Sequence, residues 1–143
     1  SHVAGCTGAT SEKTVQTLYG LPDHAMLDMG DFAGGMLKYL AKNPVRRVTI
    51  GGGIGKITKL AQGAMDLHSG RSQVDFTALS KTMNDPRLAT ANTALEAFQI
   101  AGPPLEQSIA DVALKRLVTQ WAQIDFDVVI IDRAGTIIAQ AGA

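Results

Sequence analysis

Three glycine-bearing polar turns hold the residues of this chain that are best suited to binding a small molecule. Each turn lies between a short apolar stretch and a helix-like segment, and they read Thr7-Gly8-Ala9-Thr10-Ser11, Asp28-Met29-Gly30-Asp31 and Gly51-Gly52-Gly53-Ile54-Gly55-Lys56. Glycine lets a backbone approach a bound group closely, and the N–H groups and positive dipole end of a following helix favour an anion. We therefore expect these turns to bind a small molecule that carries phosphate or carboxylate groups.

The third turn looks like a phosphate-binding loop but does not match one. A Walker A motif has four residues between its first glycine and the Gly-Lys pair, whereas Gly51 and Gly55 enclose three, and Ile57 stands where the hydroxyl belongs. The dinucleotide pattern G-x-G-x-x-G fails because Lys56 occupies its last glycine position. Two interpretations remain: an anion-accepting turn with Lys56 and Lys59 near a helix N-terminus, or a tight turn with its lysines in solvent. We favour binding, because three successive glycines are entropically costly.

The other two turns offer carboxylates and hydroxyls. Asp28, at a strand end, is suited to accept hydrogen bonds from ribose hydroxyls, although an exposed turn residue is an equal alternative. Asp31 is expected to cap the next helix, and Thr10 or Ser11 to cap the first one. Thr7 supplies a further hydroxyl at the first turn.

The loop from Met65 to Val74 concentrates reactive side chains. His68 can move a proton near neutral pH, and Arg71 can form a forked pair with a substrate carboxylate. Asp66 and Ser69 lie in the same loop. A solvated connection is the alternative interpretation. No spacing of His, Cys, Asp and Glu in the chain suggests a metal site.

Composition narrows the class of protein and partner. The 143 residues contain 13 basic and 13 acidic side chains, so no overall field favours nucleic acid or an anionic membrane. No apolar run approaches the ~20 residues of a membrane span, and no signal peptide is recognisable. Cys6 is the single cysteine; it is expected to be a small buried strand residue, and its isolation favours a cytoplasmic setting.

The order of elements predicts an α/β fold, with a mostly parallel, Rossmann-like sheet, flanking helices and a helical segment before the last strands. The expected strands are 3–6, 25–29, 45–50, 126–131 and 136–139. Expected helices begin near residues 10, 31, 55, 75 and 85, the last of these with Asp85 as cap, and a long one runs from about 105 to 124. Turns that follow parallel strands meet at one edge of the sheet, so the three turns should form one pocket. We expect residues 1–143 to be a single α/β domain, and the start without methionine indicates that they are part of a longer protein.

Several sequence blocks resemble the CbiD family of cobalt-precorrin-5B (C-1) methyltransferases. They are Leu27 to Phe32 with Gly34 to Leu40, Val48 to Gly53 with Gly55-Lys56 and Lys59 to Ala61, Thr7-Gly8 with Thr10 to Lys13, and Asp66 to Ser69 with Arg71 to Asp75. The resemblance implies an enzyme of anaerobic cobalamin (vitamin B12) biosynthesis. Such an enzyme transfers a methyl group from its co-substrate S-adenosylmethionine to C-1 of a cobalt-containing tetrapyrrole. Family chains are longer and carry an N-terminal domain ahead of this segment. The resemblance therefore implies that residues 1–143 are the C-terminal part of a longer enzyme, and the isolated piece is expected to lack full activity.

The resemblance also assigns roles to the turns. The three turns would hold the methyl donor, with Asp28 on the ribose and the turn 51–56 on the amino-acid carboxylate. The reverse arrangement is equally open, in which Lys56, Lys59 and Arg71 clamp the carboxylates of the tetrapyrrole.

The same resemblance implies that Ser69 binds the substrate and that His68 or Asp66 is the catalytic base. A homo-oligomer stays open. The rival hypothesis is a non-catalytic α/β module that binds a nucleotide or anion and regulates a partner.

Overall fold

The computed structural model of the chain describes residues 1–43, 45–68 and 73–142, and for Asp28 it describes the backbone. A five-stranded sheet has the order β2-β1-β3-β4-β5. Its strands are β1 (His2–Cys6), β2 (Met26–Asp28), β3 (Arg47–Gly52), β4 (Asp125–Ile131) and β5 (Ile137–Gly142). The first four strands are parallel, and β5 pairs antiparallel with β4. The predicted α/β class with a mostly parallel sheet is therefore confirmed.

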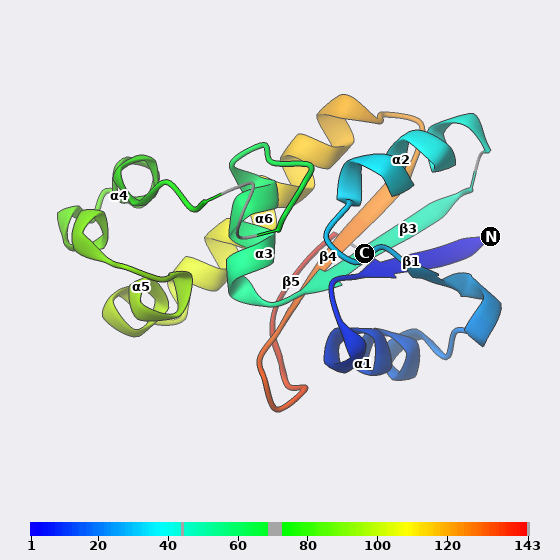
Figure 1. The fold of residues 1–143 in the computed structure, drawn as a ribbon, viewed down its shortest axis with the longest axis horizontal. Coiled ribbons are helices and arrows are strands. Elements are labelled where there is room, and N and C mark those ends of the chain that lie inside the picture. Colours follow the sequence, from blue (N-terminus) through cyan, green and yellow to red (C-terminus); the bar gives the residue numbers. More distant parts are fainter. Residues whose placement is uncertain (44, 69–72, 143) are drawn as a thin grey trace.

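Helices cover both faces of this sheet (Figure 1). α1 (Ala9–Tyr19) lies on one face, and α2 (Ala33–Lys42), α3 (Ile54–Ala61) and α6 (Pro104–Gln120) lie on the other. A lobe beside the sheet contains α4 (Phe76–Met83), η2 (Pro86–Thr90) and α5 (Ala94–Ala101), and a short helix, η1 (Asp23–Ala25), precedes β2. This division of helices follows from the strand order, because successive crossovers in opposite directions place their helices on opposite faces.

The direction in which successive strands are added to the sheet reverses at the boundary between β1 and β3. From β1 the chain first adds β2 on one side, and it then returns to add β3 and β4 on the other side. Cys6 of β1 pairs with Asp28 on one side and with Gly51 on the other, so the ends of three parallel strands form a single row. Each of the three turns leaves the sheet directly after this row. The expectation that they meet along one edge is confirmed, and the edge contains the switch point at which open α/β sheets bind ligands. The expectation of one shared pocket is not met by the groove at the third turn, because none of its lining residues comes from the first or second turn.

Two apolar cores hold the layers together. The larger core joins the sheet to α2, α3 and α6, and the smaller one lies under α1 around Ala4, Cys6 and Val15. Burial raises the pKa of the Cys6 thiol to about 12, so this cysteine stays a protonated, unreactive core residue. Its prediction as a small buried strand residue is confirmed.

The helical segment before the last strands differs in detail from the expectation. Asp85 does cap a helix with Pro86 in first position, but this helix is the short 3-10 turn η2, and α5 begins anew with Thr93 as its cap. The long helix α6 ends at Gln120, before the expected 124. The last strand, β5, begins at Ile137 and extends to Gly142.

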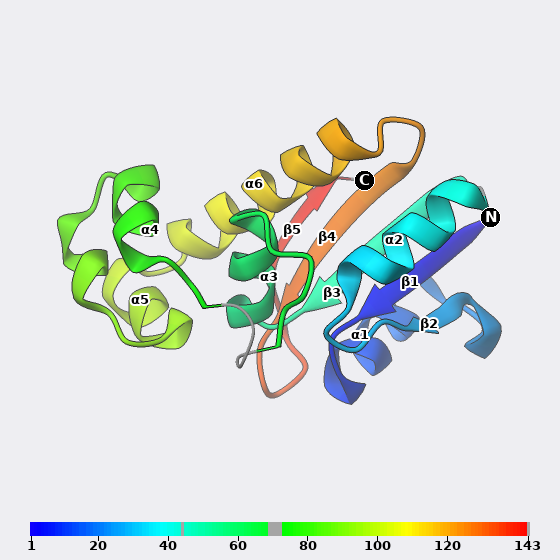
Figure 2. The same cartoon turned by 45° about the horizontal axis from the view of Figure 1, so that its top comes forward.

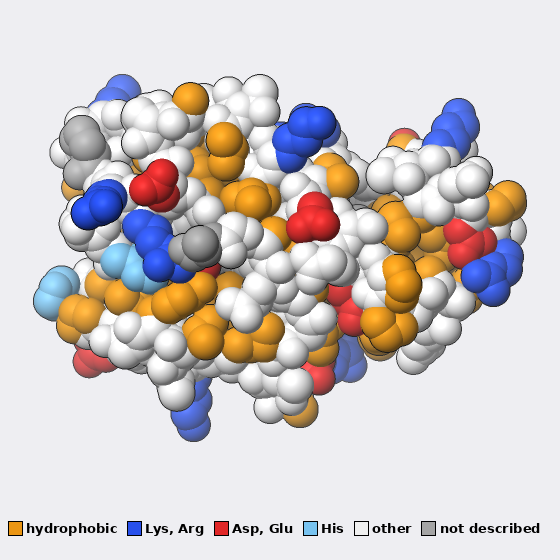
Figure 3. All heavy atoms as spheres, turned by 180° about the vertical axis from the view of Figure 1, so that it is seen from behind, with side chains coloured by type: hydrophobic (Ala, Val, Ile, Leu, Met, Phe, Trp, Pro, Cys, Tyr) orange, Lys and Arg blue, Asp and Glu red, His pale blue; other side chains and the backbone are white. Residues whose placement is uncertain are grey.

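The surface carries both signs of charge. On the face seen in Figure 3, the described acidic and basic side chains are interspersed and form no extended patch of one sign. Within residues 1–43, 45–68 and 73–142, no helix combines the length and apolar character that crossing a membrane requires.

Candidate functional site

The first turn leads into α1 through Gly8, which is the N-cap of the helix. Ser11 lies in the first helical turn, where its hydroxyl oxygen accepts a bond from the Gly8 N–H (3.2 Å) and its O–H donates to the Gly8 carbonyl (3.0 Å). The prediction that Thr10 or Ser11 caps this helix is therefore wrong, because the helix begins earlier. Gly8 is exposed and extended, and a Cβ atom there would meet nothing within 4 Å. Neither backbone conformation nor packing requires glycine at this position.

In the third turn, the first two glycines are required by packing. A Cβ atom on Gly51 would lie 2.7 Å from a methyl of Val15 in α1, and one on Gly52 would lie 2.8 Å from the Thr7 hydroxyl oxygen. These glycines bring β3 close to α1 and to the end of β1. The same contact places Thr7 beside the third turn, where its N–H donates to the Gly51 carbonyl at 3.1 Å.

The next glycines of this turn face open space. Gly53 is the N-cap of α3 with φ −73°, and a Cβ atom there would meet only the Ile131 carbonyl oxygen at 3.9 Å. Gly55 has only the Cβ of Ala94 near it, at 4.0 Å. Both glycines line a groove of about 670 Å³ whose other walls come from α5 and the β4–β5 connection. A bound group can therefore approach the start of α3 here.

In the second turn, Asp31 has a different function from the predicted one. The N-cap of α2 is Phe32, with no side-chain capping bond. The Asp31 carboxylate instead accepts a 2.5 Å hydrogen bond from the Lys56 ammonium. Gly30 has φ +53°, a conformation that glycine adopts readily. The second and third turns are thus joined by an ion pair.

Lys59 lies beneath this ion pair. It is 8% exposed and donates to the Leu67 carbonyl at 3.0 Å, to which Lys56 also donates at 3.2 Å. Burial lowers the pKa of Lys59, as does the charge of Lys56, whereas Asp31 and Asp66 act in the opposite direction. The two lysines therefore converge on one carbonyl between two chain segments.

The loop with the candidate base packs against the second turn. The Leu67 N–H donates to the Asp31 carbonyl at 2.8 Å, and Phe32 and Asp66 form an isolated antiparallel bridge. Figure 2 shows this loop running from the end of α3 to the start of α2. Asp66 is partly buried and accepts the backbone N–H of His68, which is exposed. Both candidate bases therefore lie beside the turns.

Two predicted residues lie outside the described part of the chain. Ser69 and Arg71 fall in residues 69–72, so their predicted contacts with the substrate stay predictions. The same holds for the role of Asp28, whose backbone ends β2 in the row described above.

Sequence reasoning did not assign the turn after β4 to the site. Asp132 follows this fourth parallel strand, and its carboxylate accepts the N–H groups of Ala134 and Thr136, both at 2.9 Å. Asp132 also lines the groove beside Gly53. The signal was available, because Asp132 follows a predicted parallel strand and must reach the same edge as the other turns.

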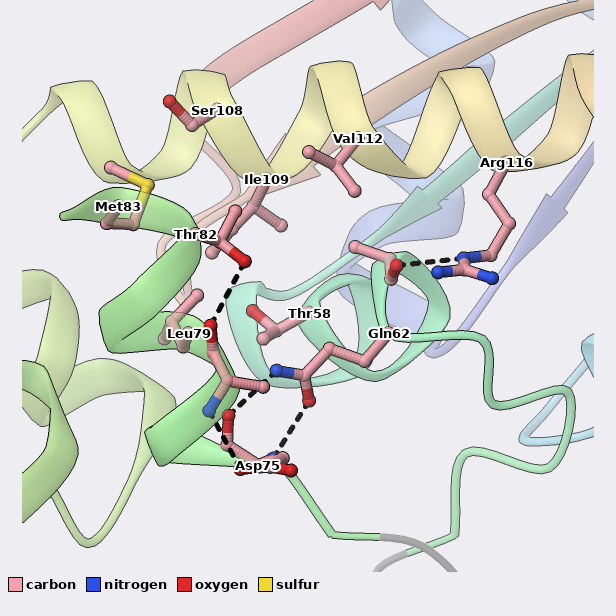
Figure 4. A pocket seen from close by; sticks show the side chains of 12 residues that line it. Thr58, Gln62, Asp75, Leu79, Thr82, Met83, Ser108, Ile109, Val112 and Arg116 are labelled. Carbon is pink, nitrogen blue, oxygen red and sulfur yellow. Dashed lines mark hydrogen bonds between the residues drawn. The ribbon is translucent and has the colours of Figure 1, made fainter.

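A second groove, of about 290 Å³, lies between α3, α4 and α6 (Figure 4). Gln62 fixes its floor by bonding both backbone groups of Asp75 at 2.8 Å, and Arg116 donates to the Ala61 carbonyl at 2.9 Å. It shares no lining residue with the groove at Gly53. These contacts tie the start of α4 to the end of α3, and α3 to α6. Among the described residues, no three His, Cys, Asp or Glu side chains come together as metal ligands would.

Comparison with known sequences identifies the family of the chain. The chain is 50% identical over 151 aligned positions to a cobalt-precorrin-5B C(1)-methyltransferase of Paramagnetospirillum magneticum, covering 98% of this chain and 42% of that protein. Proteins of the same name from Methylorubrum extorquens and Halorhodospira halophila are each 48% identical over 154 positions, covering 97% and 99% of this chain. The chain belongs to the cobalt-precorrin-5B C(1)-methyltransferase family. No family model and no solved structure matches it.

The chain corresponds to only part of these methyltransferases. It spans 42%, 42% and 41% of the length of the three relatives. The family resemblance of the sequence blocks is confirmed by these identities, which extend over almost the whole of the present chain. The activity of the longer cobalt-precorrin-5B C(1)-methyltransferases is a property of chains more than twice this length.

Proposed function

We propose that this chain forms the methyl-donor half of a cobalt-precorrin-5B C(1)-methyltransferase. In this proposal S-adenosylmethionine is the co-substrate, the methyl acceptor is C-1 of the cobalt tetrapyrrole, and the pathway is cobalamin biosynthesis in the cytoplasm. The names of the relatives support the reaction. One observation on this chain carries the proposal: the open glycines Gly8 and Gly53 begin the two helices on either side of the switch point.

The donor fits along the row of strand ends. Its amino-acid carboxylate lies at Gly53 and the start of α3, where amide N–H groups and the helix dipole favour an anion. Its ribose hydroxyls bind Asp28 at the end of β2. These strand ends are two strand spacings apart, roughly 10 Å, which matches the separation between ribose and carboxylate in an extended donor. The sulfonium then lies over the end of β1, near Thr7.

The reaction needs chiefly an aligned donor and acceptor. The bond between the methyl carbon and the sulfonium sulfur breaks as the bond to ring carbon C-1 forms, and the sulfur leaves as a neutral thioether. Holding the reacting atoms in line is worth roughly 7–11 kcal/mol of the barrier. We assign any proton removal to Asp66 or His68, because the loop that carries them packs against the second turn.

Calorimetric titration of the chain with S-adenosylmethionine, S-adenosylhomocysteine and ATP tests this proposal. We expect the two sulfur compounds to bind and ATP to bind at least about tenfold more weakly, since the third turn lacks the spacing of a phosphate loop. Gly53→Ala should weaken S-adenosylhomocysteine binding and Gly53→Val should abolish it. Both variants should stay folded with at most a small loss of stability from the changed N-cap, because a side chain there meets no neighbour closer than 3.9 Å. Preference for ATP, or unchanged binding in Gly53→Val, would contradict the proposal.

A further inference from the structure

The outer side of α2 carries an unusual combination of exposed side chains. Phe32 is 58% and Tyr39 is 63% exposed, the highest values among the exposed large apolar residues of the described chain. Phe32 is the N-cap residue just before α2 and Tyr39 lies seven positions later within the helix, a spacing that places their Cα atoms on one side of the axis and roughly 10 Å apart along it. Figure 2 shows α2 with one side against the sheet and no described element in front of its outer side. Contiguous exposed apolar surface that is rimmed by polar residues marks interaction sites, whereas single exposed apolar residues are ordinary.

Gly35 lies between the two rings on this side. It is an exposed residue inside the helix, with no αL conformation, and a Cβ atom there would meet nothing within 4 Å. Its neighbour Gly34 is different, because a Cβ atom on Gly34 would lie 2.7 Å from the Cβ of Met65. Packing therefore accounts for Gly34 but not for Gly35, and glycine inside a helix is unfavourable compared with alanine. A glycine at this position is explained if a flat ligand must come close to the helix surface there.

The charge on α2 is of one sign. The helix contains Lys38 and Lys42, both exposed, and no acidic residue. With 100° per residue, Lys42 lies on the same side as Gly35 and Tyr39, and Lys38 lies at its border. The surface thus has a flat aromatic centre and a cationic edge, which is complementary to a flat, unsaturated molecule with carboxylates at its periphery.

We infer that Phe32, Gly35 and Tyr39 form the platform on which the tetrapyrrole lies, with Lys38 and Lys42 bound to its carboxylates. This inference rests on the proposed function for the identity of the ligand. The platform begins next to the donor site, because Phe32 directly follows Asp31, which pairs with Lys56 of the third turn. The axial separation of the two residues, roughly 10 Å, is comparable with the width of a macrocycle of four pyrrole rings. Phe32, Gly35 and Tyr39 are therefore substrate-positioning residues.

The test uses cobyrinic acid, a cobalt corrin with free peripheral carboxylates, and its fully methyl-esterified form. The parent chain should bind the acid, as followed by its visible absorption and by calorimetry. Gly35→Leu should weaken this binding roughly tenfold or more, because the leucine side chain would stand between the rings. The same change should keep or raise the unfolding temperature, since leucine is the better helix former. Phe32→Ala and Tyr39→Ala should weaken binding in the same way.

Two controls separate stacking from charge and from general surface effects. The double variant Lys38→Glu, Lys42→Glu should weaken binding of the acid by roughly tenfold but leave the ester unaffected. Val118→Ala removes a 43% exposed side chain from α6 and should change nothing. S-adenosylhomocysteine binding, measured in parallel, should be the same in all these variants.

The outcomes distinguish this inference from the proposed function. If the parent chain does not bind cobyrinic acid, or if Gly35→Leu binds it as well as the parent, the platform is wrong. If the α2 variants alter sedimentation instead of corrin binding, the surface is a contact between copies of the chain, and the inference is also wrong. Loss of S-adenosylhomocysteine binding by Gly53→Val with corrin binding retained would support both proposals. A parent chain that binds the corrin on α2 but prefers ATP would overturn the proposed function alone.

Discussion

The polar side chains at the two ends of the sheet differ in burial and in hydrogen bonding. At the end where the parallel strands begin, Asp127 is 1% exposed and accepts hydrogen bonds from Arg47 (3.2 Å), Thr49 (2.6 Å) and the Tyr19 hydroxyl. His2 bonds to Thr49 at 2.7 Å and packs edge-on against Tyr19. Burial, followed by the bond to Asp127, raises the pKa of Tyr19 to about 12. The carboxylate of this network is buried and bonded by three donors, although the Arg47 side chain is 28% exposed.

At the end where the strands finish, charges are only partly enclosed. The side chains of Lys56 and Asp31 are 33% and 25% exposed, and Gly8 and Gly53 leave the starts of two helices open. The two ends of one sheet therefore serve different purposes, stability at one end and binding at the other. A buried carboxylate, Asp127, is bonded to two residues of the neighbouring strand at the amino end, while incomplete packing at the carboxyl end leaves room for binding.

The amino end should be the more sensitive to loss of a single side chain. Asp127→Ala removes the acceptor of three donors, among them the fully buried Thr49, which keeps only its bond to His2, and Arg47. We expect the free energy of unfolding to fall by on the order of 3 kcal/mol, measured by urea denaturation. Asp125→Ala, an exposed position two residues earlier in β4, is the matched control and should change stability little. Equal effects of the two variants would show that the network does not stabilise the fold.

Adjacent glycines of the third turn should separate stability from binding. Gly52→Val places a methyl-bearing Cβ 2.8 Å from the Thr7 hydroxyl oxygen and 3.3 Å from Ile57, and should destabilise the chain by about 1–3 kcal/mol. Gly53→Val has no such contact, so its effect on unfolding should be within about 1 kcal/mol, mainly through the loss of glycine at an N-cap. Urea denaturation of both variants measures the contrast. If Gly53→Val were the more destabilising, the third glycine would serve folding and not access to the helix.

The sequence predicted the architecture because the relevant signals are local and repeated. Strand, glycine turn and helix recur three times, and parallel strands then place all three turns at one edge. The prediction that Asp85 caps a helix with Pro86 in first position was confirmed, because N-caps depend on the chemistry of adjacent residues. The predicted cap at Asp31 was wrong because a distant lysine, Lys56, takes its carboxylate. Propensity at one turn cannot account for a partner 25 residues away.

The site was harder to predict than the fold for the same reason. The sequence treats Gly51, Gly52 and Gly53 as equivalent, but the first two are explained by contacts with Val15 and Thr7 that only the folded chain creates. The Asp127 network could not be predicted from the sequence, because its members come from four elements. Alternation within a strand does not reveal which polar residues meet across strands. Gly35 was visible in the sequence, but its exposure was not.

A buried carboxylate near the opposite end of the sheet provides the finest test of the comparison. Glu106, in the first turn of α6, is 3% exposed, and its Oε2 atom has no hydrogen-bond partner among the described residues. Burial raises the pKa of this carboxyl group above 4.5, although its own backbone N–H opposes the shift. Asp127 at the other end is bonded by three donors, so the two buried carboxylates should respond oppositely to neutralisation.

Glu106→Gln should therefore raise the free energy of unfolding at pH 7, by on the order of 1 kcal/mol. The sign follows from linkage: a carboxyl group with a raised pKa in the folded state imposes no penalty below the unfolded pKa of 4.5. The penalty develops as the pH rises through the folded pKa, because only then is the buried group ionised. The gain from Glu106→Gln should thus be absent at pH 4 and grow toward pH 7, as measured by urea denaturation across this range. A gain in stability that does not depend on pH would mean that it comes from packing. A loss of stability at pH 7 would mean that a partner stabilises the Glu106 carboxylate, and that the carboxyl end encloses its charges as fully as the amino end does.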